Sequence, residues 1–207
     1  MENPRPLVVG IGGAVGGPSS TERALQIALL AAEAAGARTV AFGGEAISRL
    51  PHYNPKCRDR TPDELALVAA VRNAQGLIIA SPGYHGNVSG VVKNALDLLE
   101  DTAKDDDRPY LTDMPVGVIA TAYGWQATGG VIAALRSIVH AFRGWPTPFA
   151  AAINCRLSPV DPANGAADPE VMEQLATVGQ QVAGAALRGC PIGLSPQPVE
   201  NMLHAVA

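Results

Sequence analysis

The feature that most constrains the fold is a fivefold alternation between short apolar runs and longer segments with helical periodicity. The apolar runs have the length of strands and show no polar alternation, as is typical of parallel strands covered on both faces. They are Leu7–Ile11, Thr39–Phe42, Leu77–Ala80, Val116–Ala120 and Phe149–Ile153. The pattern predicts an α/β fold, a three-layer sandwich on a five-stranded parallel sheet with strand order 2-1-3-4-5.

The segments between the runs repeat apolar residues every three or four positions, which predicts five helices. The periodic segments are Leu25–Ala32, Leu65–Val71, Val92–Leu99, Val131–Phe142 and Val171–Val182. Thr61-Pro62-Asp63-Glu64 and Asp168-Pro169-Glu170 have the residues of helix starts. Gly36, Gly144 and Gly189 follow helical periods, where a left-handed residue commonly ends a helix.

Length and composition predict one soluble domain. The 207 residues suit a single domain over residues 1–189, followed by a Pro-rich tail over 190–207, and the acidic stretch 101–113 is expected to be an exposed connection. A net charge of −4 and 4% aromatics argue against a nucleic-acid partner. No apolar run approaches the roughly 18 residues of a membrane span. The N-terminus lacks a signal-peptide pattern, and we expect a cytoplasmic protein.

The three cysteines, Cys57, Cys155 and Cys190, form no disulfide framework or zinc pattern. The histidines His52, His140 and His204 lack metal-ligand spacing, so no metal site is expected.

The loop after the first run, residues 12–21, combines glycines with three consecutive hydroxyl residues before a helix, which is typical of an anion cradle. A dinucleotide fingerprint would need glycine at Val15, and a Walker loop would need lysine at Pro18. The remaining pattern suits one terminal phosphate. A Gly-rich turn followed by an ordinary helix cap stays open as the alternative.

The loop after the third run carries the most specific pattern. Residues 81–97 read S-P-G-Y-H-G-N-V-S-G-V-V-K-N-A-L-D, and this run resembles the signature of the NADPH-dependent FMN reductase family, which includes flavin, quinone, azo and chromate reductases. The resemblance extends to Pro51–Pro55 and the first loop, and covers roughly residues 7–154. It implies a flavodoxin-like fold, which has the strand order expected above.

The resemblance also implies three groups of FMN-binding residues. The phosphate group is Ser19, Ser20 and Thr21; the ring-lining group is Pro82, Gly83, Tyr84, His85 and Gly86; the group at the pyrimidine end is Thr121, Ala122, Tyr123 and Gly124. Many members of the family have serine at the position of Ala14 and an arginine near Ser20. Their absence here predicts weaker FMN binding.

The implied function is hydride transfer from NADPH or NADH to FMN and on to an acceptor, such as free flavin, a quinone, an azo compound or a pathway intermediate. No catalytic side chain is required, and His85 is interpreted as a residue of loop shape or of a subunit contact rather than a proton donor. Lys93, Asn94 and Asp97 are expected to support the loop or an interface, while Trp125 is either a stacking residue or a surface contact.

The resemblance implies a homodimer or homotetramer and allows a partner monooxygenase. The alternatives are a flavodoxin-type electron carrier and, less well matched, a Rossmann-type dehydrogenase or epimerase.

Overall fold

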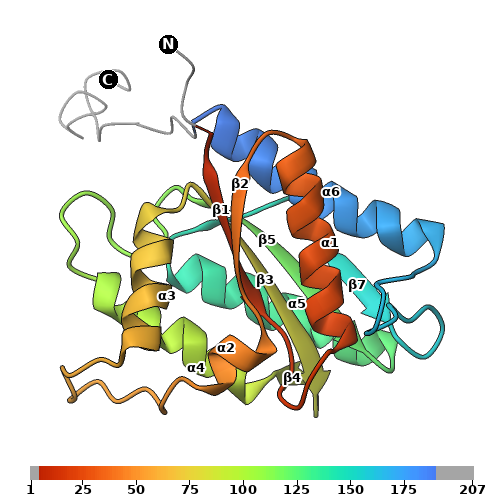
Figure 1. Ribbon diagram of the computed structural model, residues 1–207, viewed down its shortest axis with the longest axis horizontal. Coiled ribbons are helices and arrows are strands. Elements are labelled where there is room, and N and C mark those ends of the chain that lie inside the picture. The colour runs from red at the N-terminus through yellow and green to blue at the C-terminus, as the bar shows by residue number, and fades with distance from the viewer. Residues whose placement is uncertain (1–4, 190–207) are drawn as a thin grey trace, which may run out of the picture.

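The computed structural model describes residues 5–189 and contains a parallel sheet between two layers of helices (Figure 1). The strands are β1 (Leu7–Gly12), β2 (Arg38–Phe42), β3 (Gly76–Tyr84), β4 (Asn87–Val88), β5 (Pro115–Ala122), β6 (Trp145–Pro146) and β7 (Ala151–Asn154). The order is β2-β1-β3-β5, and β6 and β7 both pair with β5 in parallel. The predicted order is therefore confirmed, with β6 and β7 together in the fifth place. Strand β4 is an addition, antiparallel to the end of β3.

The expected fifth strand, Phe149–Ile153, was placed partly wrong. β6 pairs with Pro115–Val116, whereas β7 pairs with Ile119–Ala122, and residues 147–150 interrupt the strand. Pro146 and Pro148 flank Thr147, and proline has no N–H to donate to a neighbouring strand. The N–H of Thr147 still donates to the carbonyl of Val116, at 2.9 Å.

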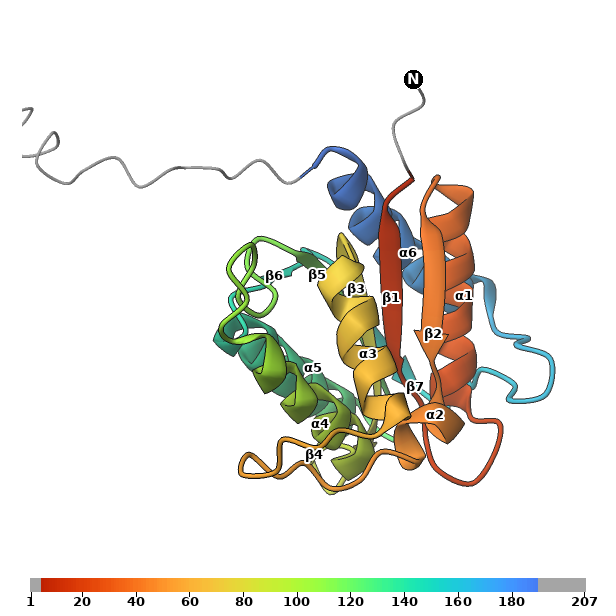
Figure 2. The same ribbon diagram turned by 60° about the vertical axis from the view of Figure 1, so that its left-hand side comes forward.

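Six α-helices and one 3-10 helix accompany the sheet in residues 5–189. They are α1 (Ser20–Ala34), α2 (Gly44–Ser48), α3 (Pro62–Asn73), α4 (Gly90–Asp97), the 3-10 helix η1 (Leu98–Thr102), α5 (Trp125–Ala141) and α6 (Pro169–Leu187). Helices α1 and α6 cover one face of the sheet, and α3, α4 and α5 cover the other (Figure 2). The short helix α2 was not anticipated.

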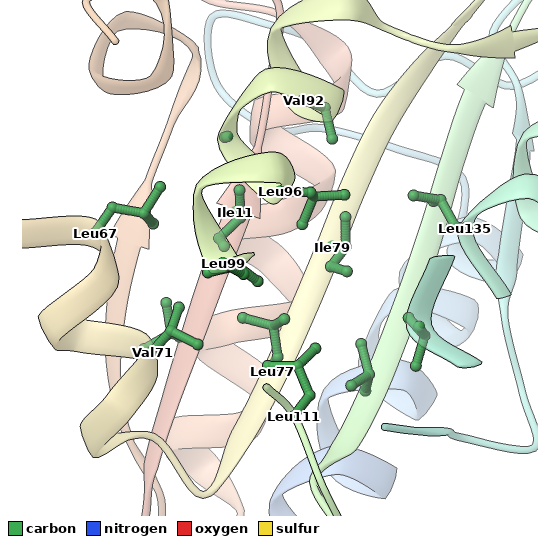
Figure 3. Close-up of a cluster of buried hydrophobic side chains, with 14 of the residues drawn as sticks. Ile11, Leu67, Val71, Leu77, Ile79, Val92, Leu96, Leu99, Leu111 and Leu135 are labelled. Atoms are coloured by element: carbon green, nitrogen blue, oxygen red, sulfur yellow. The ribbon is translucent and has the colours of Figure 1, made fainter. Parts of the chain in front are cut away.

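Each face of the sheet has its own apolar core. Leu67, Leu96 and Leu135, from α3, α4 and α5, pack with Ile79 of β3 on one face (Figure 3). On the other face the core consists mainly of small and branched residues from α1 and α6, including Leu25. These two buried layers hold the strands in place, so their carboxyl ends meet at one edge of the sheet.

Most of the helix boundaries follow the expected signals. Thr61 and Glu64 form a reciprocal capping box at the start of α3, and Pro169 occupies the first turn of α6. Gly36 and Gly189 have left-handed φ values of 102° and 53°. The expectation for Gly144 was wrong, because Arg143 takes the left-handed position after α5, with a φ of 63°.

The acidic stretch 101–113 is more than an exposed connection, so that expectation was also wrong. Leu111 is fully buried in the core. Arg72 Nε lies 2.7 Å from Asp105 Oδ2, and Arg60 Nε lies 2.7 Å from Asp101 Oδ2. Arg108 donates to the carbonyls of Val71, Arg72 and Ala74 at the end of α3. The charged residues therefore hold the stretch against α3 while Leu111 enters the core.

Within residues 5–189 no helix combines the length and apolar character needed to cross a membrane. The predicted Pro-rich tail, 190–207, lies outside the described residues.

Candidate functional site

The loops that follow β1, β3 and β5 meet in one pocket of about 300 Å³. Its lining residues are Ala14, Ser19, Ser20, Thr21, Pro82, Gly83, Tyr84, Thr121, Ala122, Tyr123, Cys155 and Pro162. A second hollow of about 470 Å³ adjoins it and shares Gly83 and Tyr123. Of the other expected residues, Gly86 and Gly124 line this second hollow, whereas His85 lines neither. All three expected groups thus contribute to one continuous concave region.

The first loop runs close to its neighbours because it contains glycine. A Cβ on Gly12 would lie 2.1 Å from the carbonyl oxygen of Ala80, and a Cβ on Gly13 would lie 2.5 Å from the nitrogen of Gly44. Both glycines also have positive φ values, 159° and 134°. A side chain at either position would push the loop away from β3 or α2 and open the pocket wall.

The three hydroxyls of this loop have different partners. Ser19 caps α1, since its Oγ accepts from the N–H of Glu22 at 3.1 Å. The Ser20 hydroxyl donates to the carbonyl of Val160 at 2.6 Å, and the Thr21 and Thr121 hydroxyls lie 2.5 Å apart. The Ser20 and Thr21 hydroxyls therefore already bond within the protein.

A phosphate fits at the start of α1 through the backbone more than through the side chains. The first N–H groups of a helix have no intrahelical acceptor, and that of Glu22 is taken by Ser19, which leaves those of Ser20 and Thr21. These two N–H groups lie at the positive end of a 15-residue helix, which favours an anion. No lysine or arginine lines the pocket. The residues present fit a phosphate, held mainly by backbone dipoles.

The second loop is a tight hairpin between β3 and β4. His85 and Gly86 are its two turn residues, with φ values of 51° and 87°, as a type I′ turn requires. The Ser81 hydroxyl donates to the carbonyl of Pro82 and accepts from the N–H of Ser89, each at 2.9 Å. These bonds attach the hairpin to the start of α4. The backbone of Pro82 and Gly83 is thereby held along the pocket.

The loop 51–61 is held against α4. Asn94 accepts from the N–H of Tyr53 at 2.8 Å and donates to the carbonyl of Pro51 at 2.9 Å. Asn94 therefore supports the loop 51–61, and not the loop after β3 for which that role was expected. Lys93 and Asp97 form an ion pair with each other along the same helix.

The third loop presents exposed aromatic rings at the pocket. Thr121 and Ala122 are buried at the end of β5, but Tyr123 is 81% exposed and Tyr84, across the pocket, is 53% exposed. Gly124 precedes α5 and has no side chain that could cap the helix. Trp125 is 59% exposed and lines neither hollow. Two exposed tyrosines therefore belong to the lining of the pocket.

Sequence reasoning missed the contribution of the loop that follows β7. Cys155 and Pro162 from this loop line the pocket, and burial raises the pKa of the Cys155 thiol, which disfavours its reactive thiolate form. The expected fifth parallel strand could have predicted this contribution, because the carboxyl end of β7, which is parallel to β5, lies at the same edge of the sheet.

Residues 5–189 contain no group of three or more histidine, cysteine or acidic residues placed to hold a metal ion.

The structure is that of a flavodoxin-like α/β protein with a pocket at the carboxyl ends of its parallel strands, where such folds bind their ligands. The family model for NADPH-dependent FMN reductase matches residues 6–155. The chain belongs to that family. The match confirms the expected family and its class, flavoprotein oxidoreductases that use FMN with NAD(P)H.

Two curated relatives align with part of the chain. The NADH:(hydroxy)cinnamate reductase subunit CrdA of Vibrio ruber is 32% identical over 94 residues, covering 45% of this chain and 44% of that protein. An NADPH azoreductase of Bacillus sp. (strain OY1-2) is 32% identical over 108 residues, covering 50% of this chain and 55% of that protein. The chain thus spans about half the length of the curated relatives it matches.

Solved structures share the fold over nearly the whole chain. FerB, an NAD(P)H:(acceptor) oxidoreductase from Paracoccus denitrificans, is 18% identical with a TM-score of 0.71, over 89% of this chain and 98% of that one. The NADH:FMN oxidoreductase EMOB in its apo form is 21% identical with a TM-score of 0.65, over 87% and 89% of the two chains. At these identities the similarity shows the fold alone.

Proposed function

We propose that the protein binds FMN in the pocket of the three loops and catalyses electron transfer from NADPH or NADH to a small-molecule acceptor. The observation that carries this proposal is the pocket itself. It brings together a helix start suited to a phosphate, a hairpin whose backbone lines the pocket, and two exposed tyrosines. These parts come from three loops that are far apart in the sequence. These are the parts that a phosphorylated flat ring needs.

The protein's own groups would bind and orient rather than exchange protons. FMN, when bound, supplies the chemistry, taking a hydride from the nicotinamide and passing electrons to the acceptor. The N–H groups of Ser20 and Thr21, with the Ser19 hydroxyl, hold the phosphate. The backbone N–H groups of Gly83 and of the third loop would face the ring and would stabilise negative charge on it, whereas Pro82, which has no N–H, would line the ring without donating. His85 lines neither hollow, and we propose no part for it in proton transfer.

The proposed cycle is ping-pong: the nicotinamide leaves before the acceptor takes its place at the same ring. Free flavin, a quinone, an azo compound or a pathway intermediate is the proposed acceptor, with a partner monooxygenase as one consumer of reduced flavin. We further propose a homodimer or homotetramer in the cytoplasm. Sedimentation tests the oligomer, and a fully active monomer would contradict it.

Flavin absorbance of the purified protein, followed by NADPH or NADH under nitrogen, separates the proposal from its rival. A reductase loses its oxidised-flavin bands on addition of nicotinamide. A flavodoxin-type electron carrier keeps them, because it binds FMN without oxidising the nicotinamide.

A further inference from the structure

A third hollow, of about 760 Å³, adjoins the flavin pocket on the side of β7. It shares Ser20, Tyr123 and Pro162 with that pocket. Most of its wall comes from the segment that joins β7 to α6, residues 155–168, which we call the β7–α6 loop. The family match ends at residue 155, so this wall is built almost entirely by residues beyond the match.

The β7–α6 loop is tied down, which makes the hollow a preformed site. Val160 is fully buried in the core between α1, α6 and the sheet, and its carbonyl accepts from Ser20. Arg23 donates from Nε to the carbonyl of Pro162 at 2.8 Å and from Nη2 to that of Ala163 at 3.0 Å. A wall held by both side chains and core packing loses little entropy when a ligand binds.

The hollow is lined largely by apolar residues, and the charged residues of its lining are all acidic. Leu157, Pro159 and Pro162 contribute apolar surface, and Leu157 is 65% exposed. The charged residues that line the hollow are Asp161 and Asp168. The basic residues nearest in sequence, Arg23 and Arg156, do not line it.

Two positive groups lie near the hollow, the start of α6 and the guanidinium of Arg23, and neither cancels the negative charge of its lining. The start of α6 carries about half a positive charge, but Asp168 and Glu170 bring two carboxylates to it, and Pro169 has no N–H to offer. The guanidinium of Arg23 already donates to two carbonyls and to Gln26. With FMN bound, its phosphate would occupy the N–H groups at the start of α1, so an anion in the hollow would meet two carboxylates and no lysine or arginine of the lining.

We propose that this hollow is the acceptor subsite, and that it selects uncharged or cationic aromatic acceptors over anionic ones. The proposal rests on the proposed function and names the acceptor class for the same site. Quinones and uncharged azo compounds fit it, whereas sulfonated dyes and carboxylated or phosphorylated acceptors are disfavoured. The charge of the β7–α6 loop, and not the flavin pocket itself, sets this preference.

The test compares naphthoquinone with naphthoquinone sulfonate, which differ in charge. FMN-loaded protein is reduced photochemically without oxygen and mixed with each quinone, so no nicotinamide step enters. The ratio of the two second-order rate constants is then compared between variants, because the intrinsic reactivity of each quinone cancels in that comparison.

The variant Asp161→Asn/Asp168→Asn removes both charges and preserves local structure. The Asp161 oxygen that accepts from the N–H groups of Ala163 and Asn164 has an equivalent in asparagine, and asparagine is also a good residue before a helix. We expect the neutral-to-anionic ratio to fall by about threefold to tenfold at low salt, and less at high salt. Leu157→Lys should lower the ratio in the same direction.

The matched control is Leu30→Lys, since Leu30 is 63% exposed and lies ~15 Å along α1 from Ser20. An unchanged ratio in both loop variants, or an equal shift in Leu30→Lys, overturns the proposal. Binding of each quinone to the FMN-free protein, measured by quenching of the protein's fluorescence, tests the same preference without flavin. A protein that binds no FMN but still prefers the neutral quinone would contradict the proposed function and leave the subsite standing.

Discussion

The hydroxyls of Thr21 and Thr121 lie 2.5 Å apart, joining the first turn of α1 to the end of β5 at the wall of the proposed flavin pocket. The two side chains are 2% and 4% exposed. Removing one hydroxyl leaves the other without its partner in a buried place. We expect Thr21→Val or Thr121→Val alone to lower the free energy of unfolding by about 1–3 kcal/mol.

The double variant Thr21→Val/Thr121→Val removes both partners and should cost less than the sum of the two single variants. Denaturant titration of the four proteins measures this coupling. Strict additivity would show that the two hydroxyls do not bond in solution.

Ser19 should contribute to phosphate binding as well as capping α1. We expect Ser19→Ala to weaken FMN by about 1–3 kcal/mol, measured by flavin titration, and riboflavin, which has no phosphate, by much less. The matched control is Thr61→Ala, which removes the equivalent cap of α3 away from the pocket. Equal losses for FMN and riboflavin in Ser19→Ala would place the phosphate elsewhere.

FMN should also bind more tightly than FAD or riboflavin, because the start of α1 offers its N–H groups to one terminal phosphate. Titration of the wild-type protein with the three flavins tests this preference. Equal dissociation constants for the three would contradict it.

His85 should matter for the shape of its turn. Its φ of 51° suits asparagine, so His85→Asn should retain the hairpin and keep single-turnover flavin reduction within about tenfold of the parent. A general acid at this position would contribute on the order of 10²–10⁴. A loss beyond a hundredfold with FMN still bound would assign His85 a chemical role. His85→Val should instead weaken flavin binding, because a β-branched residue resists a positive φ.

The ion pair of Arg60 with Asp101 should stabilise the protein above acidic pH. The hydrogen bond from Arg60 lowers the pKa of Asp101 in the folded state. Its stabilisation is present above the unfolded pKa and is lost as pH falls through the folded pKa. We expect Asp101→Asn to reduce Tm near neutral pH and to flatten the acid side of the Tm profile. Asp107→Asn, at an exposed residue of the same stretch, should leave the profile unchanged.

The strands and the three loops were predictable because they depend on local patterns, whereas the strand order was taken from the common topology of five-stranded folds of this kind. Apolar runs identified β1, β3 and β5, and the carboxyl ends of parallel strands meet at one edge wherever the helices lie. In the sequence, only Pro146 and Pro148 indicated that the fifth strand is interrupted. Their effect depends on whether the neighbouring strand needs a backbone N–H donor at those positions.

The hydrogen bonds inside the pocket could not be predicted in the same way. Thr21 and Thr121 are 100 residues apart, and no periodicity indicates that their hydroxyls meet. The burial of Leu111 was missed because the stretch around it is acidic and has no apolar periodicity, while the ion pair of Asp105 with Arg72 of α3 joins two segments far apart in the sequence. By contrast, the contribution of the β7–α6 loop could have been predicted, because a fifth parallel strand was expected and its carboxyl end lies at the same edge of the sheet.

The most direct test of the central claim is anaerobic single-turnover reduction of the FMN-loaded protein by NADPH and by NADH. The proposed function predicts that one or both nicotinamides abolish the oxidised-flavin absorbance in a saturable manner, faster than they reduce free FMN under the same conditions. A protein that binds FMN but leaves it oxidised with both nicotinamides, or that binds no FMN at all, would contradict the account.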